Sequence, residues 1–197
     1  VTVSGGWSCA LLDNGTVQCW GAGNGGRLGN GSTSDNSTPV TVVSNITTAT
    51  GISAGGEYTC AVLSGGTVKC WGSDSGGYGV FGNGSTSQQL TPVSVSNIST
   101  ATAISAGYQS ACALLSGGTI KCWGRGSYGQ LGNGSTSNSL TPVSVSNIST
   151  ATALSNGGGN QFHCALLSGG AIQCWGTDDE GKLGDGGTVP HGNTTNS

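Results

Sequence analysis

The chain has 197 residues, of which only 7% are charged, and its net charge is −3. Its five lysine and arginine residues are too few to form the basic surface that nucleic acid or anionic lipid requires, so neither partner is expected. No apolar run approaches the roughly 18 residues of a membrane-spanning helix, so membrane insertion is not expected either.

One sequence motif occurs four times along the chain, at intervals of 51, 52 and 52 residues. It reads CALLDNGTVQCWG from Cys9, CAVLSGGTVKCWG from Cys60, CALLSGGTIKCWG from Cys112 and CALLSGGAIQCWG from Cys164. A fixed period of about 50 residues is typical of an array in which one supersecondary unit is repeated and packs on its neighbours. We therefore expect a single repeat array over residues 1–197, with approximate repeats 1–48, 49–100, 101–152 and 153–197.

Each copy of the motif predicts a β-hairpin. In the first copy, residues 10–12 and 16–18 favour strands, and Asp13, Asn14 and Gly15 between them are strong turn residues. A three-residue loop that ends on a left-handed glycine places Cys9 opposite Cys19. Directly opposed residues of an antiparallel pair have Cβ atoms about 4.5 to 5.5 Å apart, which a disulfide can bridge with local twist.

The same spacing in every copy predicts four disulfides, each within one repeat. The expected pairs are Cys9–Cys19, Cys60–Cys70, Cys112–Cys122 and Cys164–Cys174. Zinc binding or free thiols are the alternative, but the spacing is not that of a zinc knuckle, and one two-stranded ribbon offers no convergent set of four ligands. Disulfides indicate an oxidising compartment, and we expect no metal and no cofactor.

Two further strands are expected in each repeat. Alternating residues at 40–42, 93–95 and 143–145 favour one strand, and residues 49–53 and 101–105 favour a short strand before the next cysteine. Four short strands per repeat, separated by glycine-rich turns and without a helix, describe a propeller blade. We therefore expect an all-β, propeller-type array of about four blades, either a partial propeller or one completed by assembly.

The hairpin pattern CALxxxGTVxCWG, followed by WGxxxxGxLGxG, resembles the repeats of the regulator of chromosome condensation family, in a cysteine-containing, secreted variety. The resemblance covers nearly the whole chain. It implies a β-propeller, commonly of seven blades, with one repeat per blade and with any binding carried by loops at its two faces. Two functions within that family are guanine nucleotide exchange on a small nuclear GTPase and inhibition of β-lactamases by a secreted propeller.

Two features depart from the family pattern. The family often has a histidine just before the first hairpin strand, whereas Ser8, Thr59 and Ala111 occupy that place here and only His163 matches. In addition, seven blades at this period would need about 350 residues. The chain is therefore expected to be part of a longer polypeptide, to be completed by partners, or to stack as an open array.

Residues suited to catalysis are sparse. His163 and His191 lie in different contexts, every cysteine has a structural partner, and no serine stands in a nucleophile-elbow pattern. The one dense acidic cluster, at residues 178–180 with Asp185, lacks the spacing of an EF-hand, and we interpret it as a solvated loop. An enzyme is therefore not expected.

The aromatic residues fall into two groups. The first directly follows the second cysteine of each repeat, and its strict recurrence favours packing between blades over a sugar-stacking platform: Trp20, Trp71, Trp123 and Trp175. The second stands at nearby repeat offsets and is a candidate contact surface, with packing between blades as the equal alternative: Trp7, Tyr58, Tyr108 and Phe162.

Nine Asn-x-Ser/Thr triplets are candidate glycosylation sites, although Asn-Gly-Ser is also ordinary turn chemistry. They begin at Asn14, Asn30, Asn36, Asn45, Asn83, Asn97, Asn133, Asn147 and Asn193.

Together these features predict a secreted, non-enzymatic repeat protein of the extracellular space or cell surface. Its uncharged surface, rich in Gly, Ser, Thr and Asn, favours a structural or adhesive role through self-association, such as a filament or surface assembly. The alternative is a protein-binding module of the inhibitor type, in which one propeller face covers a partner. Attached glycans are a further hypothesis.

Overall fold

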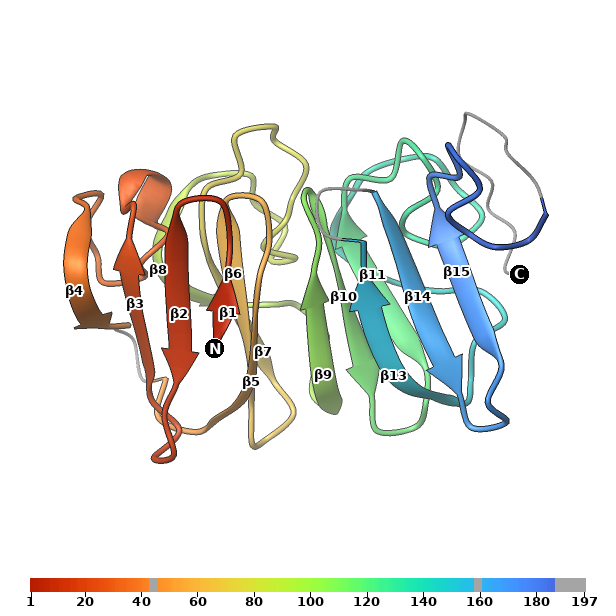
Figure 1. Ribbon diagram of the computed structural model, residues 1–197, viewed down its shortest axis with the longest axis horizontal. Helices are drawn as coiled ribbons and strands as arrows, with labels where there is room; N and C mark the ends of the chain where they lie inside the picture. The colour runs from red at the N-terminus through yellow and green to blue at the C-terminus, as the bar shows by residue number, and fades with distance from the viewer. Residues whose placement is uncertain (43–45, 158–160, 187–197) are drawn as a thin grey trace.

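The computed structural model describes residues 1–42, 46–157 and 161–186. Within them the chain forms four antiparallel sheets that follow one another in chain order (Figure 1). We call each sheet a blade. The expected all-β array is confirmed, and the only helical element of this part of the chain is the short 3-10 helix η1 (Asn24–Gly26).

The strands of each blade lie side by side in sequence order. Blade 1 contains β1 (Thr2–Val3), β2 (Trp7–Leu11), β3 (Val17–Gly21) and β4 (Asn36–Thr41). Blade 2 contains β5 (Ala49–Ala54), β6 (Tyr58–Leu63), β7 (Val68–Gly72) and β8 (Gln89–Ser94). Blade 3 contains β9 (Ala101–Ala106), β10 (Ser110–Leu115), β11 (Ile120–Gly124) and β12 (Ser139–Ser144). In its described part, blade 4 contains β13 (Ala151–Asn156), β14 (Phe162–Leu167) and β15 (Ile172–Gly176).

The central hairpin of each blade has the register that the turn residues predict. In blade 1 the amide of Leu12 donates to the carbonyl of Thr16, and Gly15 adopts a left-handed conformation with φ of 76°. This turn places Cys9 opposite Cys19 in the ladder between β2 and β3. The turn therefore fixes which cysteines meet, because a hairpin loop of given length sets the register of its strands.

All four predicted disulfides are present, each across its own hairpin, and the Cα atoms of each pair are 4.0 to 4.1 Å apart. Every cysteine of the chain is paired. Each bridge closes a local loop with a sequence separation of 10, so it stabilises its own hairpin and does not tie one blade to another.

The outer strand begins earlier than the alternating valines indicate. It starts at Asn36 in blade 1 and continues through Pro39, whereas the sequence favours a strand over residues 40–42. A proline lacks the amide donor but is tolerated on an outermost strand, which has a neighbour on one side only. Val42 lies beyond the strand end, where its side chain is buried and its amide donates to Val17.

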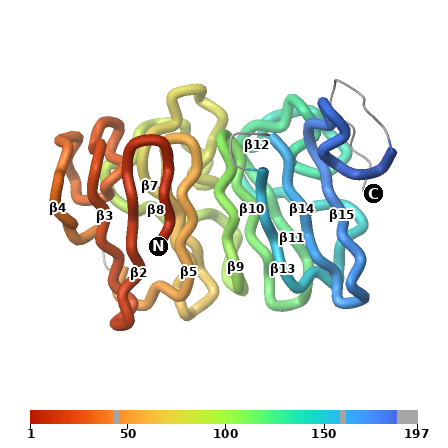
Figure 2. Tube along the Cα trace, in the orientation of Figure 1, coloured from red at the N-terminus to blue at the C-terminus, as the bar shows by residue number. Residues whose placement is uncertain are grey.

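The hydrophobic core is divided among the seams between blades. One cluster joins Val17 and Cys19 of blade 1 to Ala61 and Trp71 of blade 2, and similar clusters join blade 2 to blade 3 and blade 3 to blade 4. Blades 1 and 4 therefore lie at opposite ends of the molecule, each with one neighbour (Figure 2). Among the described residues, no helix is long and apolar enough to cross a membrane.

Removal of a single disulfide is expected to lower stability measurably. The double variant Cys112→Ala/Cys122→Ala should lose about 2 to 3 kcal/mol of unfolding free energy, because the bridge restricts the unfolded chain. Denaturant unfolding followed by tryptophan fluorescence measures the loss. The control is the wild-type chain under reducing conditions, which should lose more because all four bridges open. An unchanged midpoint in the double variant would contradict the prediction.

Candidate functional site

Each seam is closed by a tryptophan that reaches back to the preceding blade. The indole Nε1 of Trp71 donates to the carbonyl of Arg27 over 3.1 Å, and Trp123 makes the same bond to Val80 over 2.9 Å. Trp175 completes the series with a bond of 3.1 Å to Gln130. All three indoles are fully buried, so each hydrogen bond satisfies a donor that water cannot reach.

A glycine two residues after the accepting carbonyl makes room for the indole. At Gly82, a Cβ atom would stand only 2.9 Å from Nε1 of Trp123, and the backbone is left-handed with φ of 63°. A side chain at this position would therefore both clash and strain the backbone. The Leu-Gly-Asn-Gly motif is thus the seat for the tryptophan of the following blade.

Trp20 differs from the other three members of its group, because it does not lie in a seam between two of the described blades. Its side chain is half-buried, and among the residues described its indole nitrogen has no acceptor. Packing between blades is therefore seen for Trp71, Trp123 and Trp175, and for Trp20 it stays a prediction. The same face of blade 1 leaves Ser8 and Ala10 half-buried, whereas their counterparts Thr59 and Ala61 are fully buried.

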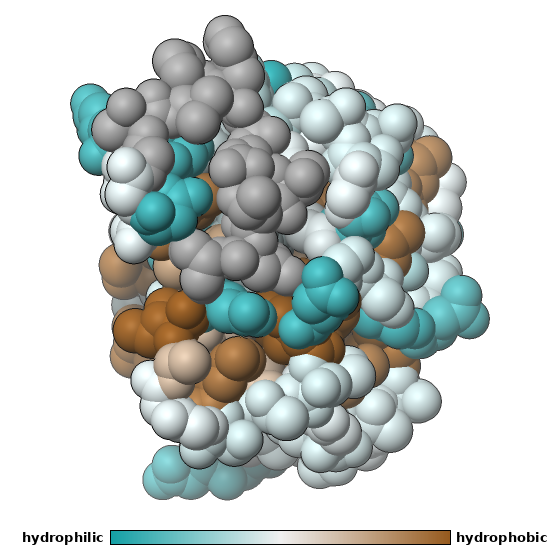
Figure 3. All heavy atoms as spheres, turned by 90° about the vertical axis from the view of Figure 1, so that its right-hand side faces the viewer, coloured by the Kyte–Doolittle hydropathy of each residue, from teal (hydrophilic) through white to brown (hydrophobic). Residues whose placement is uncertain are grey.

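At the opposite end, blade 4 exposes apolar side chains among the described residues. Ile172 is 63% exposed and Leu166 is 41% exposed. The residues in the place of Ile172 are fully buried under the following blade: Val17, Val68 and Ile120. A hollow of about 210 Å³ on this face is lined by Leu154, Cys164, Leu166 and Ile172, among others. Figure 3, which faces this end of the molecule, shows hydrophobic residues gathered at the surface.

The candidate contact surface is wrong for two of its four aromatic residues. Trp7 is 4% exposed and its Nε1 donates to Thr59 Oγ1 of the next blade over 3.1 Å. Tyr58 is 1% exposed and its hydroxyl donates to the carbonyl of Ser110 over 2.8 Å. Burial strongly raises the pKa of Tyr58 above its ordinary value of 10.0, so the hydroxyl keeps its proton. Both residues therefore belong to seams, the alternative that the sequence left open.

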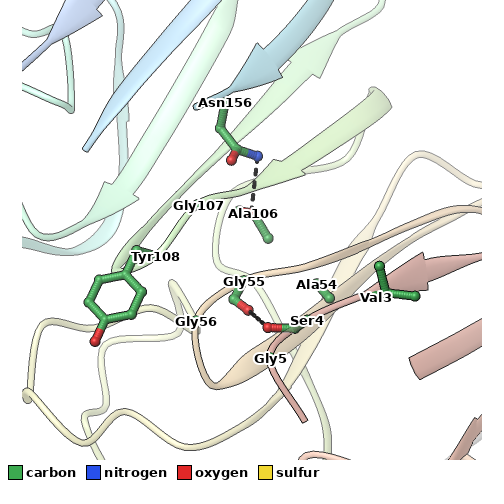
Figure 4. Close-up of a pocket in the computed structure, with 10 residues that line it drawn as sticks. All are labelled: Val3, Ser4, Gly5, Ala54, Gly55, Gly56, Ala106, Gly107, Tyr108 and Asn156. Carbon is green, nitrogen blue, oxygen red and sulfur yellow. Dashed lines mark hydrogen bonds between the residues drawn. The ribbon is translucent and has the colours of Figure 1, made fainter. Parts of the chain in front are cut away.

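The other two aromatic residues of that group are accessible. Phe162 has the same strand position as Trp7 and Tyr58, but among the described residues it is only half-buried. Tyr108 is 48% exposed and lines a pocket of about 380 Å³ where the inner strands end (Figure 4). Ser4 and Asn156 are the other polar side chains in its wall, and the rest is mainly glycine and alanine. The pocket therefore offers few groups that could bind a small ligand specifically.

A serine and a histidine meet in the seam between blades 3 and 4. Ser110 Oγ lies 3.0 Å from Nε2 of His163, whose ring stacks on Trp175 with centroids 6.0 Å apart. Ser110 is 3% exposed and His163 is 1% exposed, and neither lines a described pocket. Burial lowers the pKa of His163 to about 4, which makes it a weak base at neutral pH. The pair therefore has the geometry of a packing contact and no access for a substrate.

The acidic cluster is only partly a solvated loop. Asp178 is fully buried and its Oδ1 accepts a hydrogen bond from the amide of Leu183 over 2.9 Å, so the interpretation is wrong for this residue. Asp74 has the same place in blade 2 and accepts from two loop amides. Asp179 lies exposed and pairs with Lys182 over 2.9 Å. No group of three potential metal ligands occurs among the described residues.

The candidate glycosylation sites fall mostly in turns. Asn45 and Asn193 lie outside the described residues. Asn14, Asn97 and Asn147 are exposed, and the last two have left-handed backbones with φ of 55° and 59°. Asn30, Asn36, Asn83 and Asn133 are half-buried. In three of them, Asn30, Asn83 and Asn133, the side-chain oxygen accepts a hydrogen bond from the amide of the serine two residues later. Their glycosylation remains a prediction.

Comparison with known proteins identifies one repeat family. The family model described as "Regulator of chromosome condensation (RCC1) repeat" matches residues 14–62, 65–114 and 118–166, and a second model of this repeat matches 49–79 and 101–130. Among curated proteins, the human E3 ubiquitin-protein ligase HERC2 is 31% identical over 186 residues, which are 90% of this chain. The chain spans only 4% of the length of HERC2.

Solved structures of about twice the length share the fold. Prp20p from Saccharomyces cerevisiae is 23% identical with a TM-score of 0.79, over 96% of this chain and 48% of Prp20p. Human WBSCR16 is 20% identical with a TM-score of 0.83, over 99% of this chain and 51% of WBSCR16. The array described above is thus an RCC1-like β-propeller fold of four blades.

The tryptophan of a seam should matter to stability, and Trp20 should not. Trp123→Phe is expected to lose about 1 to 3 kcal/mol of unfolding free energy, because the buried carbonyl of Val80 loses its donor. The matched control Trp20→Phe should change stability by less than about 0.5 kcal/mol in dilute solution. Denaturant titration of both variants measures the difference. Equal losses would contradict the account of the seams.

Stability should also depend on the protonation of His163. Because its folded pKa of about 4 lies below the ordinary 6.5, the unfolded chain binds a proton between these pH values that the folded chain does not. The contribution is therefore complete above pH 6.5 and falls as the pH is lowered, by about 1.4 kcal/mol per pH unit, until it levels near pH 4.

The matched variant for this effect is His163→Ala, which copies Ala111 at the same place in blade 3. The unfolding free energy of the wild type minus that of the variant should shrink as the pH falls through this range. Chemical denaturation at several pH values measures it, and a difference that stays constant would contradict burial of the neutral ring.

Proposed function

The chain belongs to the regulator of chromosome condensation (RCC1) repeat family, and on that premise we propose that it is a non-enzymatic protein-binding array. Its role is structural: it associates with further copies of itself in an oxidising, extracellular setting. This assigns the binding to the exposed apolar side chains of blade 4.

The observation that carries the proposal is the apolar surface that blade 4 exposes among the described residues. Ile172 and Leu166 are 63% and 41% exposed, although the seams of the same molecule bury the counterparts of Ile172 completely. Burial of apolar surface stabilises by about 25 cal/mol per Å², so covering this face with protein is favourable. Contiguous exposed apolar surface of this kind is typical of an interaction site.

The charge of the chain supports association with like copies. With a net charge of −3 and only 7% charged residues, two copies repel each other weakly. Relatives of the same fold also point to protein partners: one solved structure is of Kap60 bound to yeast RCC1 (Prp20), and another study reports binding of Prp20p to Gsp1p and histones. Protein binding is therefore the class of function that these relatives favour.

The disulfides support the extracellular setting. Four bridges in 197 residues are maintained most readily where thiols are oxidised, in secreted and surface proteins. Glycans on the exposed turn residues Asn14, Asn97 and Asn147 fit the same setting.

The buried chemistry supports a role without catalysis. The Ser110–His163 pair is enclosed within a seam, and the pocket of about 380 Å³ has only Ser4, Tyr108 and Asn156 as polar side chains in its wall. Ser4 Oγ donates to the carbonyl of Gly55 over 2.8 Å, and Asn156 Nδ2 donates to the carbonyl of Ala106 over 3.1 Å, so both groups bond to the backbone. The pocket is therefore better explained as a space left where the inner strands pack together than as an active site.

The proposal predicts reversible self-association that depends on the face of blade 4. In analytical ultracentrifugation over about two decades of concentration, the wild-type mass should rise above that of the monomer. The double variant Leu166→Lys/Ile172→Lys should stay monomeric, because it places two charges on the apolar face. Tyr108→Lys is the control, since it adds a charge at an exposed aromatic residue outside this face.

Two results would contradict the proposed function. One is a wild-type chain that remains monomeric throughout the range. The other is a double variant that associates as the wild type does, which would place the contact elsewhere on the molecule.

A further inference from the structure

Asparagine followed by glycine is a chemically labile pair, because the glycine amide can attack the side-chain carbonyl of the asparagine. The chain has six such pairs, which begin at Asn14, Asn24, Asn30, Asn83, Asn133 and Asn156. The attacking nitrogen has to lose its proton and move, so a hydrogen bond from that amide opposes the reaction. The partners of the glycine amides therefore distinguish one pair from another.

Four of these amides donate to backbone carbonyls over 2.9 to 3.2 Å. They belong to Gly15, Gly31, Gly84 and Gly157. Two of the four bonds, those of Gly31 and Gly84, reach the outer strand of the next blade. The corresponding strand for the pair at Asn133 lies outside the described residues, so this pair is not compared.

The amide of Gly25 has no acceptor within the part of the chain that the structure describes. The corresponding loop of blade 3 shows why. There the amide of Tyr128, at the place of Gly25, donates to Oε1 of Gln130 over 2.8 Å. Blade 1 has Arg27 at the place of Gln130, and a guanidinium group has no acceptor atom. The amide of Gly25 is therefore free to react.

Asn24 is exposed, as is its counterpart in a blade that has a described neighbour on each side. Turns 23–26 and 126–129 are closed by the same hydrogen bond, from the last amide to the first carbonyl. Ser127 has the place of Asn24 in blade 3, and it is exposed although blades 2 and 4 pack on that blade. Water, which deamidation consumes, can therefore reach this position of the loop.

The guanidinium group of Arg27 lies at the atom where charge develops during the attack. Its Nη1 donates to Oδ1 of Asn24 over 2.6 Å, and its Nη2 donates to Oε1 of Glu57 over 2.7 Å. The group also lies over the ring of Trp7, 5.2 Å from the centroid, which helps to fix its position. Attack on Cγ of Asn24 places negative charge on Oδ1, and a positioned cationic donor stabilises that charge.

We propose that the pair Asn24–Gly25 is a site of spontaneous deamidation, assisted by Arg27. The nitrogen of Gly25 attacks Cγ of Asn24, the new N–Cγ bond closes a succinimide ring, and the Cγ–Nδ2 bond breaks. The amide proton leaves with Nδ2 as ammonia. Water then opens the ring at either carbonyl, which gives aspartate or isoaspartate at position 24. The added carboxylate changes the formal net charge from −3 to −4, and no oxidant or reductant takes part.

Blade 4 shows that this loop accepts a carboxylate at the same place. Asp179 is the counterpart of Asn24, and its Oδ1 accepts from Nζ of Lys182 over 2.9 Å. Lys182 has the place of Arg27, so an aspartate at position 24 keeps the present contact with Arg27 and turns it into an ion pair. The aspartate product is therefore expected to leave the fold intact, and the site does not depend on the proposed self-association.

The test compares two exposed pairs, each with itself in the unfolded chain. The native protein and the reduced protein in denaturant are incubated at one mildly alkaline pH, and peptide mapping by mass spectrometry follows conversion at Asn24 and Asn14. Gly15 donates to the carbonyl of Leu12 over 2.9 Å. Oδ1 of Asn14 accepts from the amide and the hydroxyl of Thr16, which are uncharged. Relative to the unfolded chain, Asn24 should react at least about 3-fold faster than Asn14.

Two results would overturn the proposed site. One is equal relative rates at Asn24 and Asn14, which would mean that the fold does not select between them. The other is a native chain in which Asn24 stays unconverted while the unfolded chain reacts. Ion-exchange chromatography provides a second readout, because the converted native protein should elute as a more acidic species that is still folded.

Arg27→Gln tests the part that Arg27 plays. It copies Gln130 of blade 3, so it removes the cation and supplies an acceptor for the amide of Gly25. Conversion at Asn24 should slow about 3- to 10-fold, whereas the matched variant Arg27→Lys keeps the charge and should slow it less. The rate at Asn14 in the same sample reports whether the variant is folded. A folded Arg27→Gln chain that converts Asn24 as fast as the wild type would show that Arg27 gives no assistance, and the wild-type comparison decides the site in either case.

Discussion

The hydrogen bond from a tryptophan indole to a loop carbonyl of the preceding blade is the contact on which the array depends. It recurs as Trp71 to Arg27, Trp123 to Val80 and Trp175 to Gln130. A glycine beneath the ring makes the approach possible, because a side chain there would collide with the indole. The Cys-Trp-Gly and Leu-Gly-Asn-Gly motifs are therefore the two partners of one contact. The Leu-Gly-Asn-Gly motif of one repeat receives the tryptophan of the next repeat.

The seams that this contact closes also hold the hydrophobic core of the array. The disulfides hold each hairpin to itself, and the hydrophobic clusters lie between blades, so no blade buries its apolar faces alone. Within the described residues, Ile172 is exposed and Trp20 is half-buried, whereas their counterparts in the seams are buried.

The hairpins could be predicted from their turn residues, whereas the contacts between repeats could not be predicted. The cysteine pairs follow from the turn at Gly15 and its counterparts, because loop length sets the register. Nothing in a strand sequence says which side faces a neighbouring blade, so Trp7 and Tyr58 could not be told from surface residues, although both are buried. Asp178 was likewise indistinguishable from its exposed neighbour Asp179, and only the loop geometry shows that it accepts a buried amide bond.

The most direct test of the central contact is hydrogen exchange of the individual indole N–H groups, observed by NMR in dilute solution. The account predicts slow exchange for Trp71, Trp123 and Trp175, whose donors are bonded and buried, and fast exchange for Trp20. Exchange at the three seam indoles as fast as at Trp20 would contradict the account.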